Sequence, residues 1–273
     1  MQLYKFILRR KLFKGQFKLF LWLLRHNQLK QVEKIDQPIT GSFKLKLNTK
    51  NFIDSCIYYT GDYEPYLKIH YKKIIKSGDV VLDVGANIGF HSLYFAELTG
   101  ITGKVLSFEP IPINFKSFKE NLELNNFPQV SANNIALGNE NASINIHIDQ
   151  EGQNPGAYSL LTLGTKNQTI KCEKGDDFLN NLGIDKVHFM KIDVEGYEFE
   201  VLKGLKNTID RSRPVINFEY DRSYQLKNND DPASIFSFLA QRNYHFFKID
   251  GYGNEIPFTY HDSVSGAEII AIP

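Results

Sequence analysis

Cysteine is scarce in this chain of 273 residues, which contains only Cys56 and Cys172. Neither cysteine belongs to a CxxC pair or to a cluster with histidines. The pattern therefore excludes a disulfide framework and a zinc site as the basis of the fold. Such low cysteine usage is typical of a reducing compartment, so we expect a cytoplasmic protein.

Long apolar runs are also missing from the N-terminal region. The longest run there is "LFLWLL", residues 19–24, which is far too short to span a bilayer. No small-residue cleavage site follows it, as a signal peptide would require. We therefore expect neither a transmembrane helix nor a signal peptide in this segment.

Acidic residues are absent from residues 1–30, which hold eight Lys or Arg residues. The formal net charge of the chain is +1, so residues 31–273 carry the difference, −7. At 100° per residue, apolar side chains fall on one helical face and basic side chains on another. The apolar set is Phe6, Phe13, Phe17, Phe20 and Leu24, and the basic set is Lys11, Lys14, Lys18 and Arg25.

This amphipathic N-terminal helical segment has two main interpretations. It either packs on the main domain with its lysines in water, or lies peripherally on the anionic inner face of the membrane through residues 1–30. Nucleic acid is not expected as a partner, because the remainder of the chain is net acidic. We predict that residues 1–57 form the N-terminal segment and linker, and that residues 58–273 form the main domain.

From about residue 58 onward, short apolar runs alternate with segments of helical periodicity. This alternation predicts a doubly wound α/β sheet. The seven predicted strands are "VVLDVG", "KVLSFE", "SANNIALG", "VHFMKIDV", "PVINFEY", "YHFFKID" and "GAEIIAIP", and "SINIHID" is an additional β segment. The polar stretch Gln150 to Gln168 is predicted to be a long loop, which is typically functional in a compact domain.

The strand-to-helix turn in "VVLDVGANIGFHS" lacks the G-x-G-x-x-G pattern of dinucleotide-binding proteins, because Asn87 and Phe90 occupy its second and third glycine positions. Asp83 stands two residues before Gly85 and favours a cationic ligand over a pyrophosphate. Glu109 ends the next predicted strand, where a carboxylate can accept both hydroxyls of a ribose. A positively charged adenosine ligand is S-adenosylmethionine, which we expect as the cofactor.

The stretch "FMKIDVEGYEFEVL" places four acidic residues, Asp193, Glu195, Glu198 and Glu200, behind an apolar run. Asp193 ends a predicted buried strand, and the carboxyl ends of such strands line the ligand crevice. Candidate general bases for deprotonating a hydroxyl are Asp193, Glu195, His91 and Glu219. Glu198 and Glu200 are expected on the solvated side of the following helix. Asp193 and Glu219 could hold Mg²⁺, but no third ligand is evident, so no metal is predicted.

Five segments resemble successive motifs of the FkbM-type S-adenosylmethionine-dependent methyltransferases: "LDVGANIGFHS", "VLSFEPIPINFKSFKENLELNN", "IALGNENASINI", "HFMKIDVEGYEFEVLKGL" and "PVINFEY". The resemblance spans residues 78–220 and implies a Rossmann-like seven-stranded methyltransferase sheet, mostly parallel, with an antiparallel last strand. It implies these cofactor-binding residues: Glu64, Asp83, Gly85, Asn87, Gly89, Glu109, Ala136, Leu137 and Asp193. Asp193, Glu195 and His91 remain the candidate catalytic residues.

The expected function is therefore S-adenosylmethionine-dependent O-methylation of a hydroxyl, with a sugar or glycoconjugate of polysaccharide biosynthesis as the acceptor. The alternatives are a non-catalytic cofactor-binding scaffold and a methyltransferase for another small molecule or for nucleic acid. An amino-methylase would need a [DN]-P-P-[YF] element where this chain has "DVEG".

Overall fold

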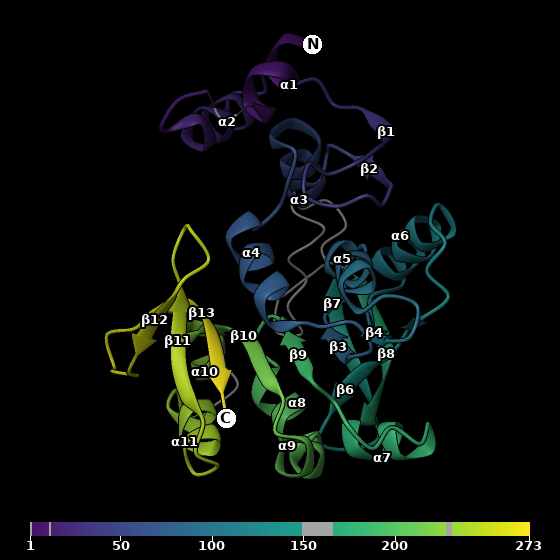
Figure 1. The fold of residues 1–273 in the computed structure, drawn as a ribbon, viewed down its shortest axis with the longest axis vertical. Coiled ribbons are helices and arrows are strands. Elements are labelled where there is room, and N and C mark those ends of the chain that lie inside the picture. The colour runs from purple at the N-terminus through teal and green to yellow at the C-terminus, as the bar shows by residue number, and fades with distance from the viewer. Residues whose placement is uncertain (1, 11, 149–165, 228–230) are drawn as a thin grey trace.

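The protein is built around a central sheet of eight strands (Figure 1). The structure is a computed structural model that describes residues 2–10, 12–148, 166–227 and 231–273. Across the sheet the strands are β12 (Glu255–Phe258), β11 (His245–Ile249), β13 (Gly266–Ile272), β10 (Val215–Asp221), β9 (Phe189–Ile192), β3 (Val80–Val84), β4 (Lys104–Phe108) and β5 (Val130–Asn133). Strands β5, β4, β3, β9 and β10 are parallel, whereas β13 is antiparallel to both of its neighbours.

This topology confirms the predicted mostly parallel sheet with an antiparallel last strand. The seven predicted strand regions all contribute to the sheet, and β12 adds one unpredicted strand at its edge. The chain passes from β3 outward to β4 and β5, and then returns to place β9 on the other side of β3. The strand order therefore reverses between β3 and β9, the kind of position where open α/β sheets bind ligands.

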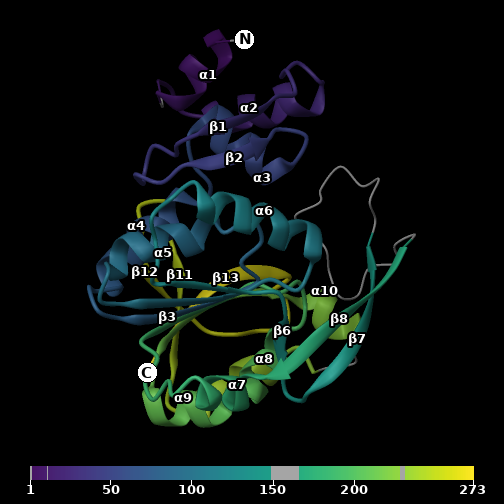
Figure 2. The same cartoon turned by 90° about the vertical axis from the view of Figure 1, so that its right-hand side faces the viewer.

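Helices cover both faces of the sheet (Figure 2). Side chains alternate along a strand, so Val81, Val105 and Phe189 join the core on one face, whereas Leu82, Leu106 and Met190 join that on the other. The first face packs under α4 (Pro65–Ile74), α5 (Phe90–Thr99) and α6 (Pro112–Glu123). The second packs under α7 (Gly175–Asn181), α8 (Glu198–Gly204), α9 (Lys206–Ser212) and α11 (Ser234–Ala240), and α10 (Arg222–Lys227) follows β10.

A second sheet of three strands has the order β6 (Ala136–Gly138), β8 (Lys166–Lys174) and β7 (Ala142–Ile148). The prediction of one strand over "SANNIALG" was wrong, because it divides into β5 and β6 in different sheets. Asn134 lies at the division, and its side-chain amide donates to the backbone oxygens of Glu109 and Pro110. The predicted loop Gln150 to Gln168 lies largely outside the described residues, but its last three residues belong to β8.

The N-terminal segment forms two helices, α1 (Gln2–Arg9) and α2 (Gln16–Arg25), instead of one continuous amphipathic helix. Gly15 precedes α2 at φ 87°, a left-handed conformation that interrupts a helix. Next come β1 (Glu33–Asp36), β2 (Leu45–Asn48), α3 (Phe52–Ser55) and a π-helical turn, η1 (Cys56–Thr60). The predicted domain boundary at residue 57 falls within η1 and stays a prediction. Within the described part of the chain, every helix is too short or too polar to cross a membrane.

Candidate functional site

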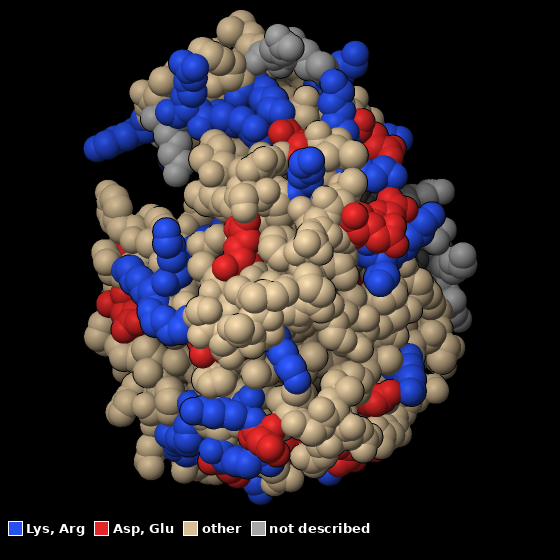
Figure 3. Space-filling model, turned by 45° about the vertical axis from the view of Figure 1, so that its right-hand side comes forward, with Lys and Arg blue, Asp and Glu red and all other residues tan. Residues whose placement is uncertain are grey.

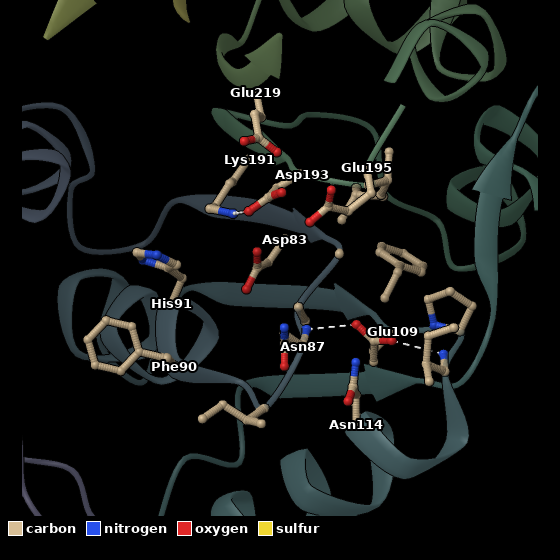
Figure 4. Close-up of a pocket in the computed structure, with 18 of the residues that line it drawn as sticks. Asp83, Asn87, Phe90, His91, Glu109, Asn114, Lys191, Asp193, Glu195 and Glu219 are labelled. Atoms are coloured by element: carbon tan, nitrogen blue, oxygen red, sulfur yellow. Dashed lines mark hydrogen bonds and ion pairs between the residues drawn. The ribbon is translucent and has the colours of Figure 1, made fainter. Parts of the chain in front are cut away.

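A pocket opens at the carboxyl ends of β3, β4 and β9, where the strand order reverses (Figure 4). Its lining includes every residue predicted for the site except Gly89, namely Glu64, Asp83, Gly85, Asn87, His91, Glu109, Ala136, Leu137, Asp193 and Glu195. Gly89 directly precedes α5 at φ 83°, and a Cβ atom there would come within 2.1 Å of the Phe118 ring on α6. The structure therefore brings these residues together, and their roles stay predictions.

The turn after β3 lies against the segment that follows β9. Gly85 has φ 88°, and a Cβ atom at this position would lie 1.8 Å from the backbone oxygen of Asp193. The amides of Gly85 and Ala86 both donate to the Phe108 backbone oxygen at 2.9 Å, which ties the turn to β4. Only glycine satisfies both the backbone conformation and the close approach, so Gly85 places Asp193 beside the turn.

Glu109 is held at the end of β4 by backbone amides on both of its carboxyl oxygens. The amide of Asn87 donates to Oε2 and that of Ile111 to Oε1, each at 2.8 Å. Burial raises the pKa of Glu109 to about 7, although these amides and the Asn114 side chain favour its ionised form. The carboxyl group is thus fixed in direction and retains lone pairs for a ligand.

Asp83 is fully buried at the floor of the pocket, where it accepts a hydrogen bond from Ser92 Oγ at 2.5 Å through Oδ2. Its other oxygen, Oδ1, has no hydrogen-bond partner among the described residues. Burial raises the pKa of this carboxyl group, whereas Lys191 lowers it. An oxygen of this kind requires a donor, because an unsatisfied buried acceptor is costly.

Glu64 and His91 form a pair at another side of the pocket. His91 Nε2 lies 3.1 Å from Glu64 Oε2, and the imidazole ring contacts Tyr71 and Phe95. Burial lowers the pKa of His91 to about 3, so its ring is neutral at physiological pH. Burial also raises the pKa of Glu64 to about 7.

Lys191 provides an ammonium group among the acids. Its Nζ atom donates to Asp193 Oδ2 (Figure 4), over a distance of 2.7 Å. The Lys191 side chain is only 3% exposed. Burial raises the pKa of Asp193, but Lys191 outweighs burial and brings that pKa below its usual range. Burial and the charge of Asp193 raise the pKa of Glu219 to about 10. Of the two carboxyl groups, Asp193 is therefore ionised, and protonated Glu219 donates a hydrogen bond to it.

Glu195 completes a group of three acids. Carboxyl oxygens of Asp193, Glu195 and Glu219 lie within 4.8 Å of one another, a spacing that could hold a metal ion. Only Asp193 and Glu219 were predicted from the sequence as possible ligands, so Glu195 is the third. Lys191 and the proton of Glu219 already compensate this cluster, however, so a cation is not needed for charge balance. Burial, and then Asp193, raise the pKa of Glu195.

The opposite part of the pocket is apolar. Ala136 and Leu137 begin β6, and Phe108, Ile111 and Ile135 lie with them in the pocket wall. All five side chains are largely buried. A flat apolar wall beside the fixed Glu109 carboxylate could accommodate a purine next to its ribose.

Residues 83–246, more than half of the chain, match the methyltransferase FkbM domain. The chain belongs to the FkbM methyltransferase family. The family identified from the sequence motifs is thereby confirmed.

Two curated relatives of this family member are methyltransferases. Hexuronic acid methyltransferase AglP of Haloferax volcanii is 31% identical over 163 residues, which are 60% of this chain and 62% of AglP. Methyltransferase 1 of Beauveria bassiana is 31% identical over 146 residues, 46% of this chain and 57% of that protein. The chain thus spans less than two thirds of either relative. Among solved structures, methyltransferase FkbM of Methylobacillus flagellatus has a TM-score of 0.47 and 16% identity, covering 80% of this chain and 52% of that one.

Three acidic or basic residues of this FkbM family member were not correctly interpreted from the sequence. Lys191 and Glu268 line the pocket, but neither was identified as a site residue. Glu198 was expected on a solvated helix face, but it is 2% exposed. Its Oε1 atom accepts from the amides of Val194 and Gly196 at 3.1 Å, so it holds the turn that presents Glu195.

Proposed function

We propose that the chain binds S-adenosylmethionine in this pocket and transfers its methyl group to a hydroxyl oxygen of a sugar or glycoconjugate. The observation that carries the proposal is the set of buried carboxyl groups at the ends of adjacent parallel strands, next to an apolar wall. Carboxylates attract a sulfonium and an ammonium group, and the apolar wall suits adenine.

The residues present fit this cofactor in three respects. Glu109 can accept the two ribose hydroxyls, because backbone amides fix its direction and leave lone pairs free. Asp83 Oδ1 needs a donor, which the methionine ammonium group would provide. Gly85 has no side chain, so the backbone of Asp193 can lie against the turn and bring its carboxyl group into the same pocket. When bound, the cofactor would supply an electrophilic methyl carbon.

The side chains around Asp193 have distinct roles in this proposal. Asp193, held ionised by Lys191, orients the acceptor hydroxyl through a hydrogen bond. Burial raises the pKa of Glu195, and its carboxylate would take the proton from that oxygen during methyl transfer. His91, neutral and bonded to Glu64, positions that carboxyl group. Orientation of the two reactants alone can supply on the order of 7 to 11 kcal/mol.

A sugar acceptor is supported by the polar side chains that line the pocket near Asp193. Glu64, Glu195, Glu219 and Glu268 line it and can form hydrogen bonds with several hydroxyl groups. AglP, with 31% identity, is named as a methyltransferase for hexuronic acid.

Both cysteines are buried and unpaired, which supports a reducing, cytoplasmic location for the enzyme.

Calorimetry and a labelled-methyl assay test the proposal together. We expect S-adenosylhomocysteine to bind and NAD⁺ not to bind, and labelled methyl groups to pass to a uronic-acid-containing glycan extract. Glu109→Gln should weaken S-adenosylhomocysteine binding about 10- to 100-fold, because it loses hydrogen bonds to a charged acceptor. Glu195→Gln should retain that binding and lower kcat about 10²- to 10⁴-fold.

The outcomes separate the alternative functions. Binding without transfer to glycan, small-molecule or nucleic-acid acceptors would support a cofactor-binding scaffold. Transfer to nucleic acid alone would replace the proposed acceptor.

Turnover should survive EDTA treatment, because Lys191 already balances the charge of Asp193. A loss of turnover that Mg²⁺ restores would instead assign a metal ion to Asp193, Glu195 and Glu219.

A further inference from the structure

The N-terminal hairpin, residues 2–25 with α1 and α2, exposes a large amount of apolar surface. Its large apolar side chains with exposed fractions between 39% and 66% are Leu3, Tyr4, Phe6, Leu12, Phe13, Phe17 and Trp22. The hairpin lies at the end of the molecule away from α7, α9 and α11 (Figures 1 and 2). Many exposed apolar side chains within one short segment indicate a site that contacts a partner or a membrane.

Basic side chains accompany this apolar surface. Arg10, Lys14, Lys18 and Arg25 are exposed, and none of them forms an ion pair with an acid within the described ranges. Blue Lys and Arg side chains accordingly gather at the top of the molecule in Figure 3. Because residues 1–30 contain no acid, all charged side chains of the hairpin itself are basic.

On α2 the apolar and basic residues share one outward face. Phe17, Lys18, Trp22 and Arg25 are all exposed, whereas Phe20 is fully buried. The prediction that Phe17 and Phe20 share one apolar face, with the lysines on another, was wrong, because Phe17 is exposed beside Lys18 whereas Phe20 is buried. The outward face thus combines aromatic and cationic groups, the composition of an interfacial helix.

The inner side of the hairpin is attached to the main body, so the outward face is presented in a defined orientation. Phe20 and Leu23 join the core that includes Tyr59. Lys5 and Arg9 face inward and pair with Asp36. The amide of Leu12 donates to Gln16 Oε1 at 2.7 Å, which connects the loop to α2.

We infer that this hairpin binds the surface of an anionic lipid bilayer. The exposed apolar side chains enter the boundary between headgroups and acyl chains, while Arg10, Lys14, Lys18 and Arg25 contact lipid phosphates. Positive charge without compensating acids favours an anionic surface over a neutral apolar partner. The inference is independent of the proposed methyl transfer, and binding requires neither cofactor nor acceptor.

Trp22 makes a direct test possible, because it is the only tryptophan in the chain and is 54% exposed. We expect its emission to shift to shorter wavelength, and its quenching by iodide to fall, when the full chain meets phosphatidylglycerol-containing vesicles. Pure phosphatidylcholine vesicles should give much weaker changes. Added salt should reverse most of the binding, because it screens the basic residues.

Matched triple variants separate surface binding from a general charge effect. Each basic residue near an anionic membrane contributes about fivefold to partitioning, so Lys14→Glu, Lys18→Glu and Arg25→Glu together should weaken binding by about a hundredfold or more. Lys104→Glu, Lys186→Glu and Lys206→Glu make the same change in net charge at exposed positions outside the hairpin. This control variant should bind vesicles much more tightly than the hairpin variant.

Apolar insertion has its own variant. Phe13→Ser with Phe17→Ser leaves the charge unchanged, and it should reduce the binding that persists at high salt. Unchanged Trp22 emission with anionic vesicles at low salt would overturn the inference. A shift of Trp22 emission that depends on protein concentration without vesicles, together with a dimer in sedimentation, would also overturn it and assign the surface to a second copy of the chain.

Discussion

At the residue scale, Lys191 decides the charge state of the pocket. It pairs in register with Asp83 on β3 and Asn217 on β10, so the three side chains form a polar row across neighbouring parallel strands. All three are buried. Asp193, Asp83, Glu64 and Glu268 all raise the pKa of the Lys191 ammonium group against the effect of burial. One cation therefore compensates several carboxyl groups that would otherwise repel one another.

Lys191→Met is expected to destabilise the protein by about 3 kcal/mol, because it leaves Asp193 and Asp83 without their cation. It should also move the acidic limb of the kcat–pH profile to higher pH, because Lys191 keeps the pKa of Asp193 low. Urea unfolding and a pH–rate profile measure the two effects. Lys203→Met removes a partly exposed lysine from its pair with Glu200, and should cost less than about 1 kcal/mol. Equal losses of unfolding free energy in the two variants would contradict the role of Lys191 as the cation that compensates the buried carboxyl groups.

The two overlooked pocket residues, Lys191 and Glu268, were hidden for different physical reasons. Lys191 interrupts an apolar strand, where its neighbours indicate burial but not which groups will face it. Glu268 lies on β13, which pairs antiparallel with β10 and brings Glu268 opposite Glu219. By contrast, Asp83, Glu109 and Asp193 each stand at a strand end, and the geometry of a parallel sheet suffices to bring them together.

At the scale of elements, the turn between β3 and α5 sets the floor of the pocket. It is predictable from the strand–glycine–helix pattern, and the alternating pattern likewise predicts the main sheet. β8 was missed, although Ile170 and Cys172 alternate with polar residues, because the polar composition before it resembles a loop. The break between α1 and α2 was missed because helical periodicity continues across Gly15.

Gly85→Ala should disrupt this turn. A Cβ atom would meet the backbone oxygen of Asp193, and alanine would be strained at φ 88°. We expect a loss of at least about 2 kcal/mol in unfolding free energy, together with loss of S-adenosylhomocysteine binding. Gly251→Ala is the matched control, because no atom lies within 4 Å of the added Cβ. If Gly85→Ala retained both wild-type stability in urea and wild-type binding, the proposed close approach would be refuted.

At the scale of the whole molecule, the concentration of buried acids couples stability to pH. Burial is the main cause of raised carboxyl pKa values at five positions: Glu64, Glu109 and Glu198 at about 7, Glu268 at about 8, and Glu219 at about 10. The ordinary value for glutamate is 4.5. Above that pH the folded chain retains protons that the unfolded chain has released, so stability falls as pH rises toward the raised values.

The clearest window for this effect is pH 6.5 to 8.5. Below pH 6.5, His70 and His91 make stability rise with pH, because burial lowers their pKa values to about 4 and about 3 and only the unfolded chain protonates them. We expect the Tm of the ligand-free protein to fall steadily across the window. Glu219→Gln keeps a hydrogen-bond donor toward Asp193 but cannot release a proton. Its Tm should therefore depend less on pH, and its advantage over the wild type should widen from pH 6.5 to 8.5. The two Tm curves diverge only if the folded protein retains the protons of these carboxyl groups. A wild-type Tm that rises with pH, or parallel Tm curves for the two proteins, would therefore show that these carboxyl groups do not govern stability.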